Sequence, residues 1–455
     1  MAVIEATLSL AEGIREVLNA TTGSKVTVGE ARQLTGGASR QTWLVDTYDA
    51  QGQHVPVVLR RDPPGHGDAD RMRAEAACLR AAGVAGVPVP TVLASGDTAP
   101  GIDAPYLLMD KVDGEAMPRK LQRDPEFEQI RTHLAEDMGF ALGLIHRSDT
   151  AGLGMLDTTD PLDAIEKIYL DMNEPRPAVE VGLRWLRENR PAKRADALVH
   201  GDFRVGNLLI DSTGIQGVLD WELAHLGDPI EDLGWLCTRA WRFGAPEPVG
   251  GLGTREQLLD GYQRATDVRP SAAELHWWEA FGTLKWLVLS RFQAERHLSG
   301  AEHSLELAAI GRRVCESEYD LLLILGLLND VPASEPRAPR PTVHDRPRLA
   351  EILELVAGTL TDEIASALGS HDRERYQLLI CANLLRTAAR EVAAGDSADE
   401  ELQLLLGQLG CESETELALL LRSGVLPYTD ATVRQDISTA VLARLRVANP
   451  RHFIR

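Results

Sequence analysis

The chain has 455 residues, of which 44% are hydrophobic and 25% are charged, and both shares are ordinary for a globular protein. This length is sufficient for two or three domains. The 47 basic and 68 acidic residues give a formal net charge of −21. Such a charge argues against general binding to nucleic acid or to anionic lipid, because both need clustered Lys and Arg side chains. We therefore expect neither nucleic acid nor membrane as a partner.

The cysteines and the apolar segments predict a cytoplasmic protein. The five cysteines are far apart and form no C-x-x-C pair, so we expect no disulfide framework, no zinc site and a reducing compartment. Residues 1–18 have the pattern of an amphipathic helix and lack the basic start and apolar centre of a signal peptide. The apolar stretch at residues 319–328 is too short to cross a bilayer.

The first third of the chain predicts a small sheet with one helix. Short segments rich in β-formers are separated by turn residues, and one segment has helical spacing of its apolar residues. The expected strands cover residues 25–29, 42–47, 56–60 and 106–109, and the expected helix covers residues 68–82.

From residue 124 onward the apolar spacing is mainly helical. The clearest helices are expected over residues 128–146, 271–296 and 302–328. One interruption lies at residues 198–220, where the apolar runs 208–210 and 218–219 flank Ser212-Thr213-Gly214. This arrangement predicts a β-hairpin inside a helical region.

Residues 331–348 differ in composition from the rest, with five prolines and almost no apolar side chains. Prolines at this density cannot continue a helix and favour an extended linker. An all-α module is expected after the linker, with helices over residues 349–367, 373–394, 398–409, 413–423 and 433–448. The predicted domain organisation is residues 1–112, residues 113–330, the linker 331–348 and the module 349–455.

The most informative segment reads His200-Gly201-Asp202-Phe203-Arg204-Val205-Gly206-Asn207 and is followed by Leu219-Asp220-Trp221-Glu222. If a hairpin joins the two strings, the side chains of Asp202, Asn207 and Asp220 converge. Oxygen ligands of this kind suit Mg²⁺, which completes its coordination with phosphate oxygens and water. A further carboxylate beside the ion can orient a hydroxyl group. These are the parts that phosphoryl transfer needs.

The spacing matches the H-R-D-x-x-x-x-N catalytic loop of protein kinases, which a metal-binding Asp follows after a hairpin. The string resembles the aminoglycoside phosphotransferase and choline kinase-like phosphotransferase family. More narrowly, it resembles the phosphotransferase domains associated with acyl-CoA dehydrogenases, whose loop is similar to HGDFRVGNLLI. The resemblance covers residues 20–325. It implies an α+β, bilobal protein-kinase-like fold, with a small β-rich N-lobe at residues 1–112 and a mostly helical C-lobe at residues 113–330. The all-α C-terminal module is separate from both lobes.

The resemblance also assigns roles to individual residues. Asp202 would accept or orient the substrate hydroxyl, and Arg204 would contact the transferred phosphoryl group. Asn207 and Asp220 would bind Mg²⁺, and Glu222 would assist the metal directly or through water. His225 and Asp228, which could suggest a metal hydrolase, are better explained by packing and by a helix start.

The nucleotide site is expected in the N-lobe. Gly36, Gly37 and Ser39 lie between two predicted strands, where a glycine turn could cover phosphates with backbone N–H groups. A hairpin turn without a ligand would look the same. The backbone of Met109 to Val112 would join the lobes and hydrogen-bond the purine, which favours ATP and leaves GTP open.

Arg60 stands where kinases carry a lysine that pairs with a helical glutamate, and Glu75 is its expected partner. An arginine can contact phosphate and carboxylate with two donors, yet its bulk and geometry differ from those of lysine. The alternative is a surface ion pair without function, since such pairs are common.

The acceptor pocket is expected in the helical region after Asp220. Arg239, Trp241 and Arg242 belong to a dense aromatic and arginine cluster. They could bind an anionic acceptor, or they could lock a helix against the lobe. The association with acyl-CoA dehydrogenases favours a hydroxyacyl-CoA or a hydroxy acid as the acceptor.

Several functional alternatives remain at this point. A nucleotide-binding pseudokinase or scaffold is favoured by Arg60, and an aminoglycoside O-phosphotransferase is compatible with the acidic composition. A protein kinase is disfavoured, because Asp220-Trp221-Glu222 replaces D-F-G. The C-terminal module could mediate formation of a homo-oligomer. The sequence therefore favours an ATP- or GTP-dependent, Mg²⁺-dependent small-molecule kinase.

Overall fold

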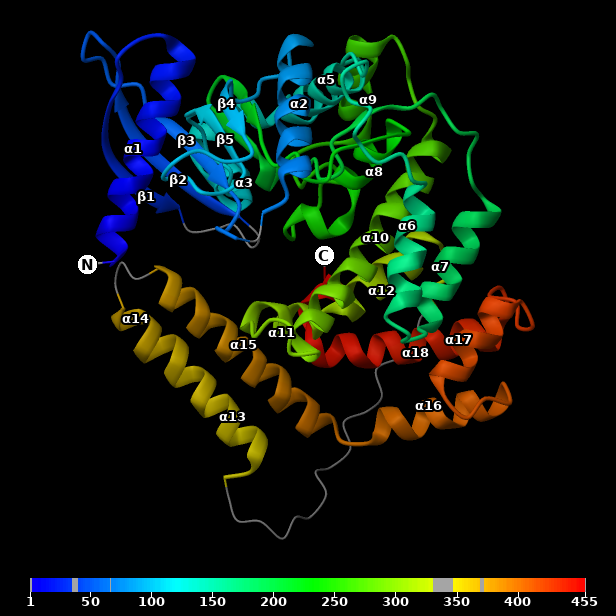
Figure 1. Cartoon of the computed structure of the whole chain (residues 1–455). Helices are drawn as coiled ribbons and strands as arrows, with labels where there is room; N and C mark the ends of the chain where they lie inside the picture. Colours follow the sequence, from blue (N-terminus) through cyan, green and yellow to red (C-terminus); the bar gives the residue numbers. More distant parts are fainter. Residues whose placement is uncertain (1, 35–39, 66, 330–346, 369–371, 455) are drawn as a thin grey trace. The chain divides into compact units, whose positions relative to one another are not determined.

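The computed structural model describes residues 2–34, 40–65, 67–329, 347–368 and 372–454 (Figure 1). The chain divides into two units. Unit 1 comprises Met1–Thr159 and Ala192–Trp278, and unit 2 comprises Asp160–Pro191 and Glu279–Arg455. The predicted domain boundaries stay a prediction. Among the helices of the described residues, none combines the length and the apolar character that crossing a membrane requires.

Unit 1 begins with a five-stranded antiparallel sheet in the order β1-β2-β3-β5-β4. Its strands are β1 (Thr27–Leu34), β2 (Gln41–Tyr48), β3 (Val57–Arg61), β4 (Val92–Gly96) and β5 (Tyr106–Asp110). The four predicted strands are confirmed, and the short β4 is an addition. The first strand begins later and runs longer than expected.

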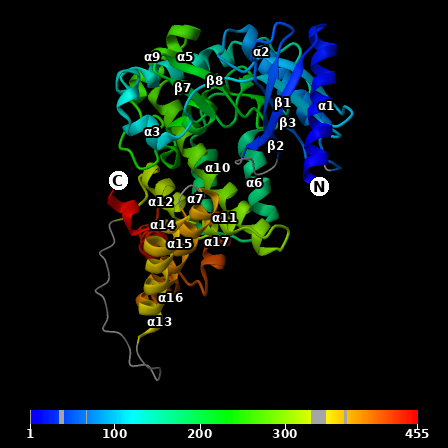
Figure 2. The ribbon, with the colours of Figure 1, turned by 90° about the vertical axis from the view of Figure 1, so that its left-hand side faces the viewer.

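Two helices cover opposite faces of this sheet. Because side chains alternate along a strand, Leu59 and Arg60 of β3 point to different faces. Helix α1 (Ala2–Thr22) packs in one apolar cluster with Leu59 and Leu108 (Figure 2). Helix α2 (Ala69–Val84), whose N-cap is Asp68, lies on the face of Arg60 and bonds to it through Glu75. The alternation therefore sends one charged side chain of a buried strand toward α2.

The rest of unit 1 combines helices with two small strand pairs. β6 (Ala197–Val199) pairs with β9 (His225–Gly227), and β7 (Leu208–Asp211) pairs with β8 (Gly214–Val218), which confirms the predicted hairpin. The region expected as one helix over residues 128–146 is two helices, α4 and α5. The helical segments are α3 (Pro118–Arg123), η1 (Pro125–Phe127), α4 (Glu128–Arg131), α5 (Leu134–His146), η2 (Val205–Asn207), α8 (Ile230–Cys237), η3 (Arg239–Arg242) and α9 (Arg255–Thr266).

Helices α5 and α9 approach each other closely. A Cβ atom at Gly261 of α9 would lie 1.8 Å from the carbonyl oxygen of Glu136 in α5. Such an atom cannot be accommodated without moving backbone, so the contact requires glycine at this position.

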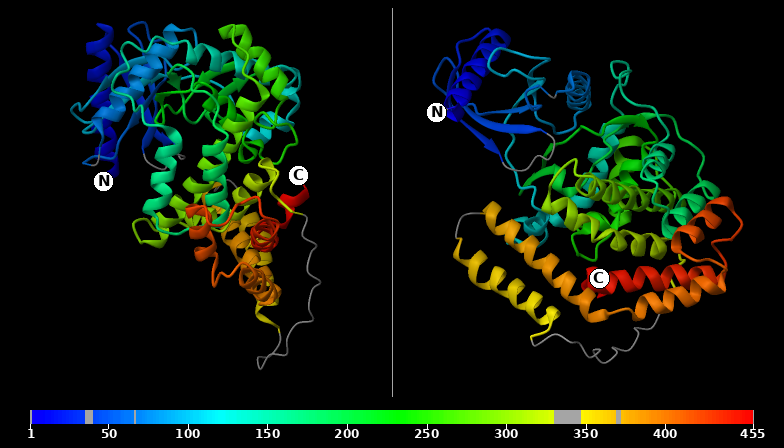
Figure 3. Two further views of the ribbon diagram at one scale, coloured as in Figure 1. Left: turned by 90° about the vertical axis from the view of Figure 1, so that its right-hand side faces the viewer. Right: turned by 60° about the horizontal axis from the view of Figure 1, so that its bottom comes forward.

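Unit 2 is entirely helical in the part of the chain that the structure describes, and Figure 3 shows its C-terminal helices. The prediction of an all-α region after residue 349 is confirmed, although residues 349–367 form three segments. The segments are α6 (Pro161–Asp171), α7 (Pro177–Glu188), α10 (Ala272–Leu298, beginning in unit 1), α11 (Leu305–Gly311), α12 (Val314–Ile324), α13 (Leu349–Gly358), η4 (Thr359–Ile364), α14 (Ala365–Ala367), α15 (Asp372–Ala394), α16 (Ser397–Gln408), α17 (Glu414–Ser423), α18 (Ala431–Ala448) and η5 (Pro450–Ile454).

The C-terminal helices share a core with α7 and α12. Val181 of α7 and Leu322 of α12 belong to the same buried cluster as Leu417 and Val441 of α17 and α18. Ion pairs with buried carboxylates accompany this core. Glu180 accepts two hydrogen bonds from Arg422, and Glu318 lies between Arg176 and Arg444, as the distances of 2.6 Å to 3.1 Å show. Apolar burial and paired charge therefore join the residues before and after the proline-rich stretch.

Asp436 of α18 is a fully buried carboxylate without such a partner. Neither of its side-chain oxygens has a hydrogen bond within the described residues. Burial and the nearby Glu414 raise the pKa of Asp436 to about 7, although Arg444 acts in the opposite direction. Between about pH 4 and about pH 7, the folded protein therefore keeps a proton on Asp436. The unfolded chain, in which the carboxyl pKa is about 3.9, releases that proton.

We predict that Asp436→Asn makes the protein more stable at neutral and alkaline pH. In the wild type the free energy of unfolding should fall as the pH rises from about 4 to about 7, by up to about 4 kcal/mol. The variant should lack this loss. Urea denaturation at pH 5 and pH 8 measures it, and equal pH dependence in both proteins would contradict the prediction.

Candidate active site

The segment with the predicted catalytic loop joins β6 to β7, and one buried carboxylate fixes its start. Asp232, in the first turn of α8, accepts hydrogen bonds from the backbone nitrogens of His200 and Gly201 at 2.7 Å and 2.9 Å. Its Oδ2 also lies 3.1 Å from Nε2 of His146. Burial alone would raise the pKa of Asp232, but the hydrogen bond and charge of His146 and the hydrogen bond from the backbone of His200 hold it below its usual value. Asp232 therefore anchors the loop as an ionised group.

His200 supports the loop in its neutral form. The backbone N–H of Asp202 donates to Nδ1 of the imidazole, and Nε2 lies 3.0 Å from the carbonyl oxygen of Leu219. These two bonds require an unprotonated Nδ1 and a protonated Nε2. Complete burial lowers the pKa of His200, which also favours the neutral imidazole. The residue ties the loop to the end of the hairpin.

Two backbone positions near the loop have positive φ. Gly201 has φ of 80°, and a Cβ atom there would lie 2.3 Å from the carbonyl oxygen of Leu223, so only glycine fits. Asp220, directly after the hairpin, has φ of 66°. Such a conformation in a residue other than glycine costs free energy and is concentrated at functional sites.

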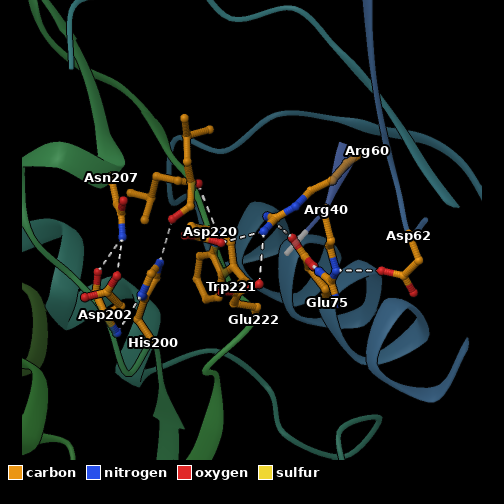
Figure 4. Close-up of polar contacts among 12 residues, drawn as sticks. Arg40, Arg60, Asp62, Glu75, His200, Asp202, Asn207, Asp220, Trp221 and Glu222 are labelled. Carbon is orange, nitrogen blue, oxygen red and sulfur yellow. Dashed lines mark hydrogen bonds and ion pairs between the residues drawn. The ribbon is translucent and has the colours of Figure 1, made fainter. Parts of the chain in front are cut away.

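Three donors orient the carboxylate of Asp202. Trp235 donates its indole N–H to Oδ1 at 2.9 Å, and Asn207 donates from Nδ2 to Oδ2 at 2.8 Å. Arg204 lies with Nε at 3.1 Å from both oxygens. Figure 4 shows Asn207 facing Asp202. The sequence predicts that Asp202, Asn207 and Asp220 converge. Asp202 and Asn207 are in contact, and the convergence with Asp220 stays a prediction. Trp235 is a contact that the sequence does not reveal.

A second cluster connects the sheet to the end of the hairpin. Arg60 lies 2.6 Å from Oε1 of Glu75, 2.6 Å from Oδ1 of Asp220 and 3.3 Å from Glu222 (Figure 4). The side chains of Arg60 and Glu75 are 15% and 2% exposed, so the predicted pair is not a surface ion pair. Burial raises the pKa of Glu75. Burial lowers the pKa of Arg60, but the negative charges of Glu75 and Asp220 outweigh burial, and the pKa of Arg60 is raised.

Arg40 and Asp62 complete this cluster, and neither is among the residues that the sequence singles out. Arg40 contacts Oε2 of Glu75, and its Nε lies 3.0 Å from Oδ1 of Asp62. Arg40 directly follows the glycine-containing segment, which was the only sequence signal available. Asp62 lies directly after β3, and nothing in its local pattern distinguishes it from an ordinary turn residue.

The oxygen donors of the cluster fit a divalent cation. Among the described residues, no three or more His, Cys, Asp or Glu side chains are grouped to hold a metal ion. Asn207 donates to Asp202 through Nδ2, which leaves its Oδ1 as an acceptor, and its backbone carbonyl accepts a hydrogen bond from Leu219, the residue before Asp220. The cluster has two excess negative charges, because two arginines contact four carboxylates. These groups are Arg40, Arg60, Asp62, Glu75, Asp220 and Glu222. A Mg²⁺ ion with one or two carboxylate ligands suits this set.

The other residues expected at the nucleotide lie at several places. Gly36, Gly37 and Ser39 are outside the described residues. Met109 is buried in β5, opposite Val58 of β3. Val112 follows β5, and its side chain lies beside Gly217 of the hairpin, so this segment runs from the sheet to the β7–β8 pair. Their contact with a nucleotide stays a prediction.

The aromatic and arginine cluster lies beside Asp202. The rings of Trp241 and Trp235 are in tilted contact, with centroids 5.0 Å apart and an interplanar angle of 56°, and the guanidinium of Arg204 lies 5.0 Å from the Trp241 ring. Arg242 donates to the carbonyl oxygen of Cys237 at the end of α8. Arg239 lies in η3, two residues after Cys237. Trp241 and Arg242 therefore support the helix that carries Trp235 and Asp232, and binding of an acceptor by this cluster stays a prediction.

Comparisons with known proteins show the fold and the family of this chain. A crystal structure of a "putative aminoglycoside phosphotransferase" from Ralstonia eutropha JMP134 superposes with a TM-score of 0.57 and 21% identity, over 69% of this chain and 98% of that one. The fold is thus kinase-like, with an N-terminal sheet, a mostly helical remainder and a helical C-terminal region, as predicted. Residues 30–275 match the Phosphotransferase enzyme family. The chain belongs to this family, whose members are small-molecule kinases.

Curated relatives are acyl-CoA dehydrogenase family proteins. Acyl-CoA dehydrogenase family member 10 of Mus musculus is 30% identical over 46% of this chain, and family member 11 of Gallus gallus is 25% identical over 64%. The chain spans 20% and 40% of the lengths of these two relatives. Residues 369–452 match a second family, described as a domain of unknown function (DUF6285).

We predict that Asp232→Ala lowers the free energy of unfolding by at least about 3 kcal/mol, because two buried backbone N–H groups and His146 lose their acceptor. Urea denaturation measures the change. Asp260→Ala is the matched control, since Asp260 is an exposed partner of Arg269 and should change stability by less than about 0.5 kcal/mol. A loss below about 1 kcal/mol for Asp232→Ala would contradict its role as an anchor.

Proposed function

We propose that this phosphotransferase transfers the γ-phosphoryl group of ATP to a hydroxyl group of a small molecule. The arrangement of Asp202 carries the proposal. Its carboxylate is held by Trp235, Asn207 and Arg204 at one end of the hairpin. Asp220 follows the second strand of the hairpin, whose last residue pairs with the first residue of β7, so it lies at the same open end and bonds to Arg60 from the sheet. An oriented acid near a cationic and oxygen-rich cluster is what phosphoryl transfer requires.

In the proposed reaction the acceptor hydroxyl donates its hydrogen bond to the carboxylate of Asp202. The hydroxyl oxygen forms a bond to the γ-phosphorus, the bond between that phosphorus and the leaving oxygen of ADP breaks, and the hydroxyl proton moves to Asp202. Arg204, which bonds to Asp202 here, would turn to the transferred phosphoryl group. Its stacking on Trp241 allows this movement while the guanidinium stays beside the ring.

The nucleotide would be bound by both lobes. Arg60 would contact the phosphates, and the backbone between Met109 and Val112 would contact the purine. Gly36, Gly37 and Ser39 would cover the phosphates. Asn207 and Asp220, assisted by Glu222, would hold Mg²⁺, which when bound neutralises phosphate charge. ATP is favoured over GTP.

For the acceptor we propose a hydroxyacyl-CoA or a related hydroxy acid. Two observations support this choice. The relatives are acyl-CoA dehydrogenase family proteins. Arg204 puts positive charge beside Asp202, the proposed catalytic acid, which favours an anionic acceptor over a polycationic aminoglycoside. An aminoglycoside is therefore the second candidate.

A pseudokinase is the competing proposal, and one observation favours it. Arg60 already neutralises Asp220 and Glu222, the carboxylates that would bind the metal. A lysine at this position would have one ammonium group and less reach to several carboxylates. If Arg60 could not leave Asp220, the site would bind the metal weakly.

We predict that Mg²⁺-ATP raises the thermal midpoint of the wild-type protein. A ligand at a hundredfold excess over its Kd adds about 2.7 kcal/mol of stability. Asp220→Asn should abolish the rise, because it removes a metal ligand charge while asparagine tolerates the positive φ. Asp260→Asn, at an exposed position of α9, should keep the rise. The proposed site would be contradicted if Mg²⁺-ATP stabilised the Asp220→Asn variant as much as the wild type, or if it did not stabilise the folded wild-type protein.

A transfer assay tests the acceptor. Purified protein is incubated with Mg²⁺-ATP and a hydroxyacyl-CoA, the corresponding free hydroxy acid or an aminoglycoside, and the phosphorylated product is measured by mass spectrometry. We expect transfer to the acyl compounds, and a decrease of at least about 100-fold in Asp202→Asn with unchanged affinity for Mg²⁺-ATP. Transfer to the aminoglycoside alone would support the second candidate. Nucleotide binding without transfer to any acceptor would support the pseudokinase.

A further inference from the structure

Glu75 is a buried carboxylate with two cationic partners. It is 2% exposed, and each of its two oxygens contacts a different arginine. Arg60 bonds to Oε1 at 2.6 Å, and Arg40 contacts Oε2. A single arginine with two donors would be sufficient to pair one carboxylate. The second arginine therefore needs an explanation.

The two arginines differ in what else they contact. Arg40 is 7% exposed and bonds through Nε to Asp62. The other oxygen of Asp62 accepts a hydrogen bond at 2.8 Å from the backbone nitrogen of Asp68, the N-cap of α2. Arg40 thus connects the start of β2, the end of β3 and the start of α2. Its ion pairs are with the residue after β3 and with α2.

Arg60, in contrast, also contacts residues outside the sheet and α2. Its Nη2 contacts Asp220 and Glu222 beyond the hairpin, two carboxylates whose side chains are 32% and 34% exposed. In the proposed function these carboxylates take up Mg²⁺ and Arg60 takes up phosphate. Arg60 must then change partners, whereas the contacts of Arg40 need not change.

We propose that Arg40 is a positioning residue that keeps Glu75 paired and in place while Arg60 moves from Asp220 to the phosphates of the nucleotide. This inference rests on the proposed function. Without Arg40, the buried Glu75 would have Arg60 as its only cation, and weakening that bond would leave a buried charge poorly paired, which is costly. Glu75 would then retain Arg60 and compete with the nucleotide for it. Burial also raises the pKa of Glu75, so a poorly paired Glu75 would tend to take up a proton.

The test is a double-mutant cycle on the affinity for Mg²⁺-ATP, measured by calorimetry with the full chain. We expect Arg40→Gln to weaken binding by about tenfold. In a Glu75→Gln background the same substitution should have less than about a twofold effect, because Arg40 then has no charge to hold. Arg40→Lys keeps the charge and should recover part of the affinity.

Arg61→Gln is the matched control. Arg61 is the next residue of β3 and bonds to Gln41 and to the carbonyl oxygen of Ile102. The substitution Arg61→Gln should lower the free energy of unfolding without changing the affinity for Mg²⁺-ATP. If Arg40→Gln does not fold, the cycle is made with Arg40→Lys, for which a coupling to Glu75 of at least threefold is expected.

The outcomes separate this inference from the proposed function. Suppose that the wild-type protein binds Mg²⁺-ATP. If Arg40→Gln then binds it with the same affinity, or if Arg40→Gln weakens binding equally with Glu75 and with Gln at position 75, the inference is overturned and the proposed function is left intact. Absence of Mg²⁺-ATP binding by the folded wild-type protein would overturn the proposed function and the inference with it.

Discussion

A buried carboxylate that stays ionised must have partners, and this requirement determines the geometry around the predicted catalytic loop. Asp232 has no exposed surface and is satisfied by two backbone N–H groups of the loop and by His146. Because the unpaired group would cost several kcal/mol, loop and helix are held in one arrangement. His200 then connects the loop to the hairpin, and Asp202 meets Trp235 and Asn207.

The same requirement governs the sheet and its helix. Glu75 is paired by Arg60 and Arg40, and Arg60 carries positive charge across to Asp220 and Glu222. An arginine in place of a lysine therefore does more than change one phosphate contact. Its planar fork lets one side chain bond to three carboxylates, so the charge around Asp220 and Glu222, the residues proposed to bind the metal, depends on where Arg60 points.

The C-terminal helices illustrate the difference between chain order and packing. Residues after the proline-rich stretch are helical as expected, yet their apolar residues are buried together with Val181 and Leu322, and Arg422 and Arg444 pair with Glu180 and Glu318. A boundary in composition marks where the backbone cannot be regular. It does not determine which helices share a core, because that depends on apolar faces that are far apart in sequence.

The sequence by itself determined the hairpin and the predicted catalytic string, since these depend on local spacing and on residue types that phosphoryl transfer requires. The resemblance of this string to a known family then gave the kinase-like class and the Arg60–Glu75 pair. Only the tertiary structure decided that Trp235 and Asp232 support the loop and that Arg40 joins the cluster at Glu75. These contacts bring together residues 31 to 35 positions apart in the chain. Tryptophan, aspartate and arginine at such separations have many ordinary explanations, and the packing of α2 and α8 against the loop and the sheet selects one of them.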